Sequence, residues 1–258
     1  MRQVSIIPNR EHLAECLELA KKYNLGFEYN DFFMPDVLDD IRHTEEIIAM
    51  YQKQDLPAFT TLHGAFFDVI PFSMDAKIHQ IAEMRIEQSI RIAEKLGAKA
   101  VIFHTNYNPF LNSEDYIKGW IQTNAAYWSK VLERHPDINI YLENMFDTTP
   151  DIMEALSEKL SVYANYGVCL DYAHASLSKA APEVWAKQLG RFVKHVHMND
   201  NDLVSDLHLA WGDGQIDRNC FYECMEIYLK EASVLIETTP MDNKIRSLEM
   251  LQKEGFIK

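Results

Sequence analysis

The sequence alternates between two kinds of segment along its whole length. Short apolar runs rich in β-branched and aromatic residues are typical of buried strands. The stretches between them repeat apolar residues at the 3.6-residue spacing of an amphipathic helix. The predicted strands are 4–8, 26–30, 59–63, 100–104, 138–144, 167–171, 193–198 and 233–238. The predicted helices are 10–23, 37–53, 75–98, 113–134, 150–160, 182–191, 217–231 and 241–254.

This alternation predicts the fold class. Strands that alternate with helices form parallel sheets, because each helix carries the chain back to the start of the next strand. Eight such units, with no Pro/Gly/Ser-rich linker or low-complexity run between them, favour a closed barrel over a doubly wound sheet. We therefore expect an α/β protein, a single (β/α)8 TIM barrel that spans residues 1–258 as one domain.

Composition narrows the classes of partner. The chain has 258 residues and a formal net charge of −14, which argues against DNA as a partner because phosphate contacts rely on Lys and Arg. Its N-terminal apolar run is too short for a signal peptide, and no stretch approaches a membrane span. The four cysteines form no CxxC pair and are expected to be reduced thiols. We expect a cytoplasmic protein with a small-molecule substrate and no membrane partner, and its oligomeric state stays open.

Potential metal ligands gather where the predicted strands end. In a (β/α)8 barrel the active site lies at the carboxyl ends of the strands. Residues 195–217 alone hold three histidines and five aspartates with no Lys or Arg. The histidines and carboxylates that end or follow six successive strands are His63, His104, Glu143, Asp171, His174, His197, Asp206, His208 and Glu237.

A metal site explains this set better than nine separate surface residues. One His or Glu at a strand end is usually solvated or hydrogen-bonded, but that explanation would have to hold at six strands in succession. Nitrogen and oxygen ligands without thiolates suit Zn²⁺, Mn²⁺ or Fe²⁺ better than Mg²⁺. The number of ligands exceeds the need of one ion, so one to three divalent ions per chain are expected, with zinc or manganese favoured.

Four further residues are candidates with two interpretations each. Glu28 ends a strand and either contacts substrate or a metal ligand, or is solvated. His195 either supports the site or is a hydrogen-bonded histidine of the barrel interior. Phe67 and Trp211 follow ligand positions, where an aromatic ring either stacks on a substrate or packs a loop.

Four segments resemble a known superfamily. They are "LENMFD" (142–147), "LDYAHA" (170–175), "HMNDND…DLHLAWGDGQID" (197–217) and "LIET" (235–238). Their order is similar to that of the xylose isomerase-like TIM-barrel superfamily, which includes sugar phosphate isomerases and epimerases and the endonuclease IV-type enzymes of AP endonuclease family 2.

The resemblance implies how the ligands would be shared. In the endonuclease IV pattern, Glu143 would bridge the first two of three ions. The ligands of the three ions would be His63, His104 and Glu143; Glu143, Asp171, His197 and Glu237; and His174, Asp206 and His208. In the epimerase pattern one ion would be bound by the second of these sets, and Glu143 and Glu237 would transfer protons as the catalytic residues.

Two enzymatic functions and one non-enzymatic function follow. The first is a metal-dependent isomerase or epimerase of a small sugar or sugar-like substrate, which moves a proton next to a carbonyl through a metal-stabilised enediolate. The alternative is an endonuclease IV-like multinuclear zinc phosphodiesterase or hydrolase. A metal-binding barrel without catalysis is the third. The acidic chain and a loop without cations after strand 193–198 favour the first over DNA cleavage.

Overall fold

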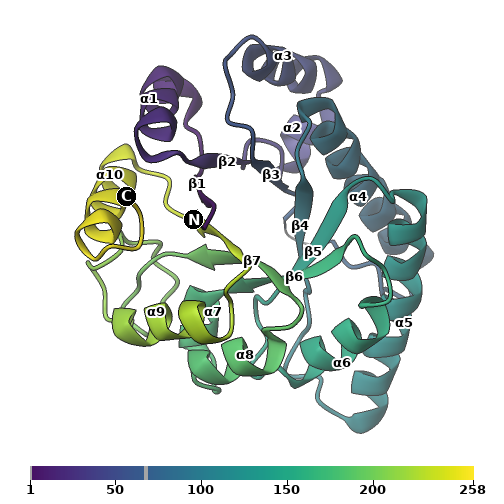
Figure 1. The fold of residues 1–258 in the computed structure, drawn as a ribbon. Helices are drawn as coiled ribbons and strands as arrows, with labels where there is room; N and C mark the ends of the chain where they lie inside the picture. Colours follow the sequence, from purple (N-terminus) through teal and green to yellow (C-terminus); the bar gives the residue numbers. More distant parts are fainter. Residues whose placement is uncertain (1, 67–68) are drawn as a thin grey trace.

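The computed structural model describes residues 2–66 and 69–258, and in these residues eight parallel strands close into a barrel in sequence order (Figure 1). This confirms the predicted (β/α)8 TIM barrel. The strands are β1 (Val4–Ile6), β2 (Gly26–Tyr29), β3 (Thr60–His63), β4 (Ala100–His104), β5 (Asn139–Glu143), β6 (Tyr166–Asp171), β7 (Val193–Met198) and β8 (Ser233–Ile236).

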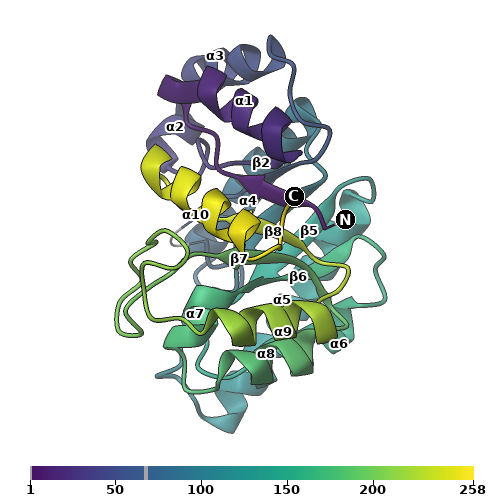
Figure 2. The same cartoon turned by 60° about the vertical axis from the view of Figure 1, so that its left-hand side comes forward.

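Helices surround the barrel on its outside (Figures 1 and 2). The α-helices are α1 (Leu13–Tyr23), α2 (Pro35–Asp39), α3 (Ile41–Gln52), α4 (Ala76–Leu96), α5 (Glu114–Arg134), α6 (Asp151–Leu160), α7 (Tyr172–Leu177), α8 (Pro182–Leu189), α9 (Arg218–Ile227) and α10 (Met241–Lys253). A short 3-10 helix, η1 (Arg10–His12), precedes α1. Each of the eight predicted helical stretches contains at least one of these helices.

The ends of α4 follow the signals in the sequence. The side chain of Asp75 accepts a hydrogen bond from the backbone N–H of Lys77 at 2.8 Å and caps the first turn. At the other end Gly97 adopts a φ of +68°, a left-handed conformation that glycine reaches without steric cost. Between them Ile86, Ile90 and Ala93 are fully buried on one stripe.

Two details of the helices differ from the sequence prediction. The stretch 37–53 is divided at Asp40, whose backbone (φ −89°, ψ 83°) leaves the helical region and whose side chain caps α3 at the N–H of His43. The short helix α7 was not predicted, because six residues are too few to display a helical period. Asp171 at the end of β6 caps α7 by accepting from the N–H of His174.

The core explains why the strands read as nearly continuous apolar runs. Parallel strands of a barrel are covered by helices outside and by one another's side chains inside. Accordingly β4 and β6 are buried at every position. Packing is close enough that a Cβ built on Gly64 would lie 2.3 Å from the ring of Phe103. A larger residue therefore cannot follow His63 without displacing the ring of Phe103 on β4.

The strand register brings the candidate ligands to the same end of the barrel. His104 of β4 pairs with Glu143 of β5, and Asp171 of β6 pairs with His197 of β7. All four residues lie in the last two positions of their strands. Figure 2 shows the loop between β7 and α9 on the side of the barrel opposite the N-terminus. These four candidate ligands therefore lie at the carboxyl-terminal mouth of the barrel.

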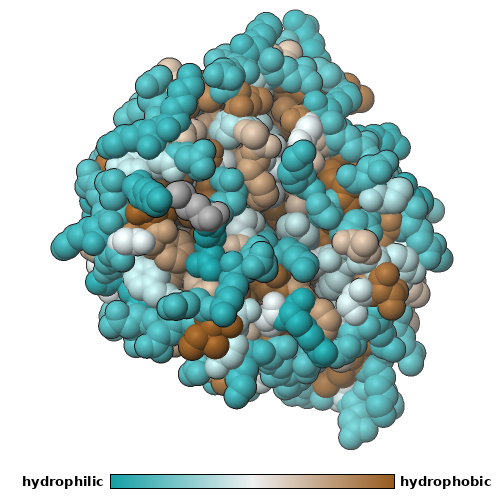
Figure 3. All heavy atoms as spheres, in the orientation of Figure 1, coloured by the Kyte–Doolittle hydropathy of each residue, from teal (hydrophilic) through white to brown (hydrophobic). Residues whose placement is uncertain are grey.

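The exterior is polar. Hydrophilic side chains dominate the margin of the face drawn in Figure 3, and hydrophobic ones are scattered among them. This distribution accords with the net charge of −14. Every helix in the described part of the chain is too short or too polar to cross a bilayer. Cys16, Cys169, Cys220 and Cys224 are free thiols, as expected.

Candidate metal centre

Glu143 lies at the centre of the candidate site. Its Oε2 atom is 3.4 Å from Nε2 of His63 and 3.6 Å from Nε2 of His104, while its Oε1 atom is 3.1 Å from Nδ1 of His197. The three histidines come from β3, β4 and β7, and all four side chains are buried. Closure of the barrel thus brings together side chains that are far apart in sequence.

A second group shares Glu143 and His197 with the first. Nδ1 of His197 is also 3.5 Å from Oε2 of Glu237 at the end of β8. One ligand atom each from Glu143, Asp171, His197 and Glu237 lies within 4.8 Å of the others, and the same holds for His63, His104 and Glu143. The structure therefore brings together the six inner residues that the sequence singled out, in two groups that meet at Glu143.

Cys169 was not a candidate in the sequence, yet its sulfur also lies within 4.8 Å of ligand atoms of Glu143 and His197. Burial raises the pKa of this thiol well above its usual value, which disfavours the thiolate that a metal would bind. We therefore assign Cys169 to the barrel interior beside the site.

Unsatisfied buried atoms indicate that a cation fits between these groups. Six nitrogen or oxygen atoms of the inner residues are buried and have no hydrogen-bond partner among the described residues: His63 Nε2, His104 Nδ1, Glu143 Oε2, Asp171 Oδ2, His197 Nε2 and Glu237 Oε2. Buried polar atoms are rarely left without partners, because each costs about 1–3 kcal/mol. Nitrogen and carboxylate oxygen atoms at these separations fit a divalent ion such as Zn²⁺ or Mn²⁺.

Electrostatics give the same indication. Burial raises the pKa of Asp171 to about 7, and the neighbouring carboxylates of Glu237 and Glu143 raise it while His174 opposes them. Burial lowers the pKa of His104 to about 3, so its imidazole is neutral and keeps a lone pair for a metal. A bound cation would stabilise the ionised carboxylates that repel one another here.

The three remaining candidates form an outer group at the rim. Nε2 of His174 and Nε2 of His208 approach the same oxygen, Oδ2 of Asp206, at 3.3 and 3.1 Å. Their Nδ1 atoms face backbone carbonyls, that of Asn144 at 2.9 Å and that of Glu237 at 3.0 Å. Both imidazoles therefore present Nε2 to one carboxylate oxygen, but the ligand atoms of His174, Asp206 and His208 do not all lie within 4.8 Å of one another as those of the inner groups do.

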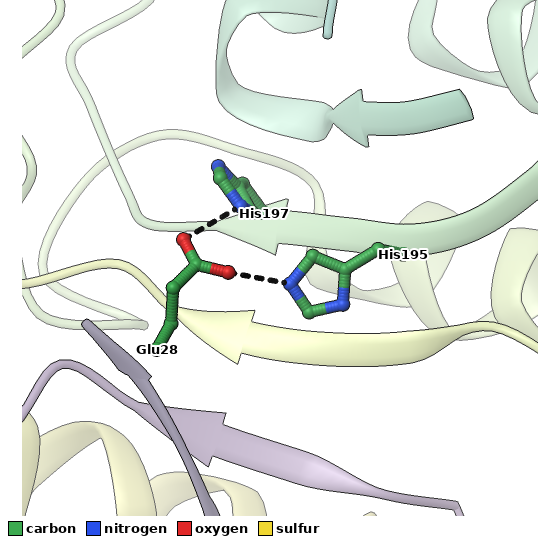
Figure 4. A group of neighbouring side chains, drawn as sticks. All are labelled: Glu28, His195 and His197. Carbon is green, nitrogen blue, oxygen red and sulfur yellow. Dashed lines mark hydrogen bonds and ion pairs between the residues drawn. The ribbon is translucent and has the colours of Figure 1, made fainter. Parts of the chain in front are cut away.

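Glu28 and His195 lie beside His197, which belongs to the inner group (Figure 4). One oxygen of Glu28 is 3.1 Å from Nε2 of His195, and the other is 3.1 Å from Nε2 of His197. Burial alone would raise the pKa of Glu28, but the charge of His197 and the hydrogen bonds from both histidines outweigh it and lower the pKa. Glu28 is therefore buried and contacts His197, one of the candidate metal ligands.

One aspartate stabilises the loop after β7. The sequence alone did not distinguish its role from that of the other aspartates in this stretch. Asp200 is fully buried, and its carboxylate accepts hydrogen bonds from the backbone N–H groups of Asn201, Gly212 and Ile216 at 2.9, 2.9 and 3.1 Å. A Cβ on Gly214 would lie 2.3 Å from Oδ1 of Asp200. Asp200 therefore stabilises the backbone of the loop, whereas Asp206 contacts His174 and His208.

The aromatic candidates have different outcomes. Phe67 lies outside the described residues. Trp211 is 1% exposed, donates from Nε1 to the hydroxyl of Tyr222 and packs against Phe221, so its placement corresponds to loop packing and not to a substrate contact. Phe66, which was not a candidate, has its ring centroid 4.4 Å from that of His104 and 5.1 Å from that of His63.

Two cavities adjoin the ligands. One of about 680 Å³ is lined by Arg10, Phe66, His208, Glu237 and Lys244 among others. The second, of about 720 Å³, is lined in part by Tyr107, Phe146, His174 and Asp206. Each has room for a small organic molecule beside the candidate metal ligands.

Curated relatives share part of this sequence. The uncharacterized protein MJ1311 of Methanocaldococcus jannaschii is 29% identical over 206 residues, which cover 74% of this chain and 68% of that protein. The probable endonuclease 4 of Halorhodospira halophila is 26% identical over 173 residues, and that match covers 57% of this chain and 56% of the relative.

Solved structures share the fold at low identity. The TTHB071 protein from Thermus thermophilus, soaked with ZnCl2, has a TM-score of 0.77 at 21% identity, covering 98% of this chain and 97% of its own. A D-tagatose 3-epimerase-like protein has a TM-score of 0.76 at 22% identity, covering 98% and 96%. Endonuclease IV from Thermus thermophilus has a TM-score of 0.64 at 15% identity, covering 97% and 98%.

A family model accounts for nearly the whole chain. The model described as "Xylose isomerase-like TIM barrel" matches residues 13–254, which include every ligand candidate. The structural neighbours include both an epimerase-like protein and endonuclease IV, so proteins with this fold differ in their named activities. From the match and the barrel together, we conclude that this chain belongs to the xylose isomerase-like TIM-barrel family.

Proposed function

We propose that this protein is a metal-dependent isomerase or epimerase of a small sugar or sugar-like substrate. The observation that carries the proposal is that two glutamates approach the same imidazole nitrogen, Nδ1 of His197. Oε1 of Glu143 is 3.1 Å and Oε2 of Glu237 is 3.5 Å from Nδ1 of His197. Glu237 also lines the cavity of about 680 Å³, so it has access to a bound molecule.

Two neighbouring carboxylates suit proton transfer next to a carbonyl. Glu237 would take the proton from the carbon beside the carbonyl, and the C–H electron pair would form the enediolate double bond as the carbonyl oxygen becomes negative. Glu143, starting in its protonated form, would give its proton to the opposite face of the same carbon and invert it, so that at the end Glu237 holds a proton and Glu143 is ionised. A divalent ion held by Glu143, Asp171, His197 and Glu237 would polarise the carbonyl and stabilise this negative charge.

The cavities favour a small substrate over a nucleic acid. Among the described residues that line them, Arg10 and Lys244 are the cations other than histidine. Arg10 is paired with Asp31 at 2.7 Å, and Lys244 is buried and donates to the carbonyl of Thr239. DNA binding draws its affinity from many phosphate contacts to Lys and Arg, and these linings offer few.

The outer group supports a second candidate function. His174 and His208 converge on Asp206, which would complete a third metal position that proton transfer does not require. Three ions suit phosphoester hydrolysis, in which they stabilise attacking and leaving oxygens. The alternative is therefore an endonuclease IV-like multinuclear zinc phosphodiesterase or other hydrolase.

One screen separates the two. The protein, reconstituted separately with Mn²⁺ and Zn²⁺, is incubated in D₂O with a panel of ketoses, and in parallel with bis(p-nitrophenyl) phosphate and an abasic-site duplex. We expect solvent deuterium to enter a ketose beside its carbonyl, and Glu237→Gln to stop this exchange. Glu254→Gln, which alters a glutamate paired with Arg218 away from the ligands, is the matched control. Phosphodiester cleavage without deuterium exchange would instead assign the hydrolase.

A further inference from the structure

We infer that Glu28 is a positioning residue of the candidate metal centre: it accepts the Nε2–H of His197 and thereby fixes Nδ1 of that imidazole as the metal-binding atom. This rests on the proposed metal centre. Glu28 is then neither one of the nine candidate metal ligands nor one of the two glutamates proposed to transfer protons. Three features support it: the surroundings of His197, the anchoring of Glu28, and the separation of the two oxygens of Glu28.

The two nitrogens of His197 have different surroundings. Nε2 is 3.1 Å from Oε1 of Glu28, whereas Nδ1 is 3.1 Å from Oε1 of Glu143 and 3.5 Å from Oε2 of Glu237. A neutral imidazole carries one N–H and one lone pair, and the partner of the N–H determines which nitrogen is free to bind a metal. With Glu28 as acceptor, the proton lies on Nε2 and the lone pair on Nδ1 faces the other ligands.

Glu28 is itself held by neighbours on three strands. Its Oε2 atom accepts from the hydroxyl of Thr61 at 2.7 Å and contacts Nε2 of His195 at 3.1 Å. Nδ1 of His195 is in turn 2.7 Å from the hydroxyl of Ser233 on β8. Glu28, Thr61 and His195 are fully buried, so the carboxylate has little freedom to turn away from His197.

A different interpretation would make Glu28, His195 and His197 the ligands of an ion of their own, because their ligand atoms also lie within 4.8 Å of one another. The distances favour two separate contacts: His195 has hydrogen-bond geometry with Glu28, and His197 lies at the same distance as an ion-pair partner. Each imidazole approaches its own oxygen of Glu28 at 3.1 Å, and Figure 4 shows the carboxylate between the two rings. A single ion would require both imidazole nitrogens to point at one common centre.

The effect of such a partner on metal binding is known in magnitude. A carboxylate that accepts the second N–H of a metal-bound histidine fixes the ring and makes the other nitrogen a stronger ligand. Removal of such a partner typically costs about 10–100-fold in metal affinity. Loss of Glu28 should therefore lower the affinity of the inner site while the number of ions bound at saturation stays the same.

The test measures Zn²⁺ affinity and stoichiometry by competition with a chromogenic chelator for the full chain and three variants. Glu28→Leu removes both acceptors, whereas Glu28→Gln keeps one carbonyl oxygen for His197 and guards against loss of folding. Glu87→Gln is the matched control, because Glu87 contacts His135 at a similar 3.2 Å but lies on α4, outside the barrel. Nitrogen-15 NMR of the imidazoles reports the tautomer of His197.

We expect Glu28→Leu to weaken zinc binding by about 10–100-fold at unchanged saturation, Glu28→Gln to weaken it less, and Glu87→Gln to match the unaltered protein. The zinc-loaded unaltered protein should carry the proton of His197 on Nε2. Affinity within threefold in Glu28→Leu, a proton on Nδ1, or the loss of one whole equivalent of zinc would overturn the inference. If the unaltered protein binds no metal, the proposed metal centre itself fails, which is a separate result.

Discussion

Oε1 of Glu143 and Nδ1 of His197 are 3.1 Å apart although β6 lies between their strands. The contact joins side chains of two strands that are not hydrogen-bonded to each other, at the mouth of the barrel. Glu143 uses its other oxygen toward His63 and His104. Glu143 therefore links the two inner ligand groups, and its two oxygens face different sides of the site.

Glu143 should accordingly be the most damaging ligand to lose. In Glu143→Ala both inner groups lose a carboxylate oxygen, so we expect the number of bound ions to fall by more than one equivalent. Metal analysis after dialysis against buffered Zn²⁺ measures this, and Glu254→Ala controls for a change in net charge. Full metal content in Glu143→Ala would show that Glu143 is not a bridge.

The raised pKa of Asp171 predicts how stability depends on pH in the metal-free protein. Its pKa of about 7 lies above that of an unfolded aspartate, so the folded state holds a proton that the unfolded state releases. The contribution of Asp171 to stability is thus fully present at low pH and falls as the pH rises through 7.

Because His104 titrates in the opposite sense, the test compares two proteins and not one profile. Asp171→Asn keeps an oxygen for the N–H of His174 but cannot ionise. Its stability relative to the unaltered protein should increase from pH 4 to pH 7, by at most about 1.4 kcal/mol per pH unit. Urea unfolding at each pH provides the measurement, and a difference that does not change with pH would contradict the assigned shift.

The fold and the inner ligands could be predicted because both are local in sequence. Strands show as short apolar runs, and His63, His104 and Glu143 are polar residues at the ends of such runs. Parallel topology then brings strand ends to one mouth without further information.

What the sequence left open depends on contacts between distant segments. The two interpretations of Glu28 could not be separated, because its partners are His195 and His197, which are 167 and 169 positions away. Asp200 and Asp206 lie in one acidic stretch, and only the folded loop shows that the first accepts backbone N–H groups and the second faces histidines. Trp211 was equally ambiguous until its packing against Phe221 was seen.

Because Asp200 and Asp206 have different partners, removal of metal should affect different parts of the loop after β7 to different extents. Three hydrogen bonds from the backbone to Asp200 do not require a metal, whereas Asp206 lies between two histidines at the rim. Removal of metal should therefore speed amide exchange around residues 203–208 and leave the N–H groups of Gly212 and Ile216 protected. Equal protection throughout the loop with and without chelator would show that Asp206 is not a metal ligand.

Asp206 also separates the two candidate functions. It belongs to the outer group, where it lies 3.3 Å from His174 and 3.1 Å from His208, whereas the glutamates proposed to move protons approach His197. In Asp206→Asn an isomerase should keep deuterium exchange within about threefold of the unaltered protein, because the contacts of Glu143 and Glu237 with His197 remain. A hydrolase that needs a third ion should lose one equivalent of zinc and about 10²–10³-fold in rate, the cost of removing one charge-stabilising group.

Parallel measurement of zinc content, deuterium exchange and phosphodiester cleavage in Asp206→Asn decides between the two functions. Loss of deuterium exchange in Asp206→Asn at unchanged inner-site zinc would mean that the outer group takes part in proton transfer, contrary to the function proposed.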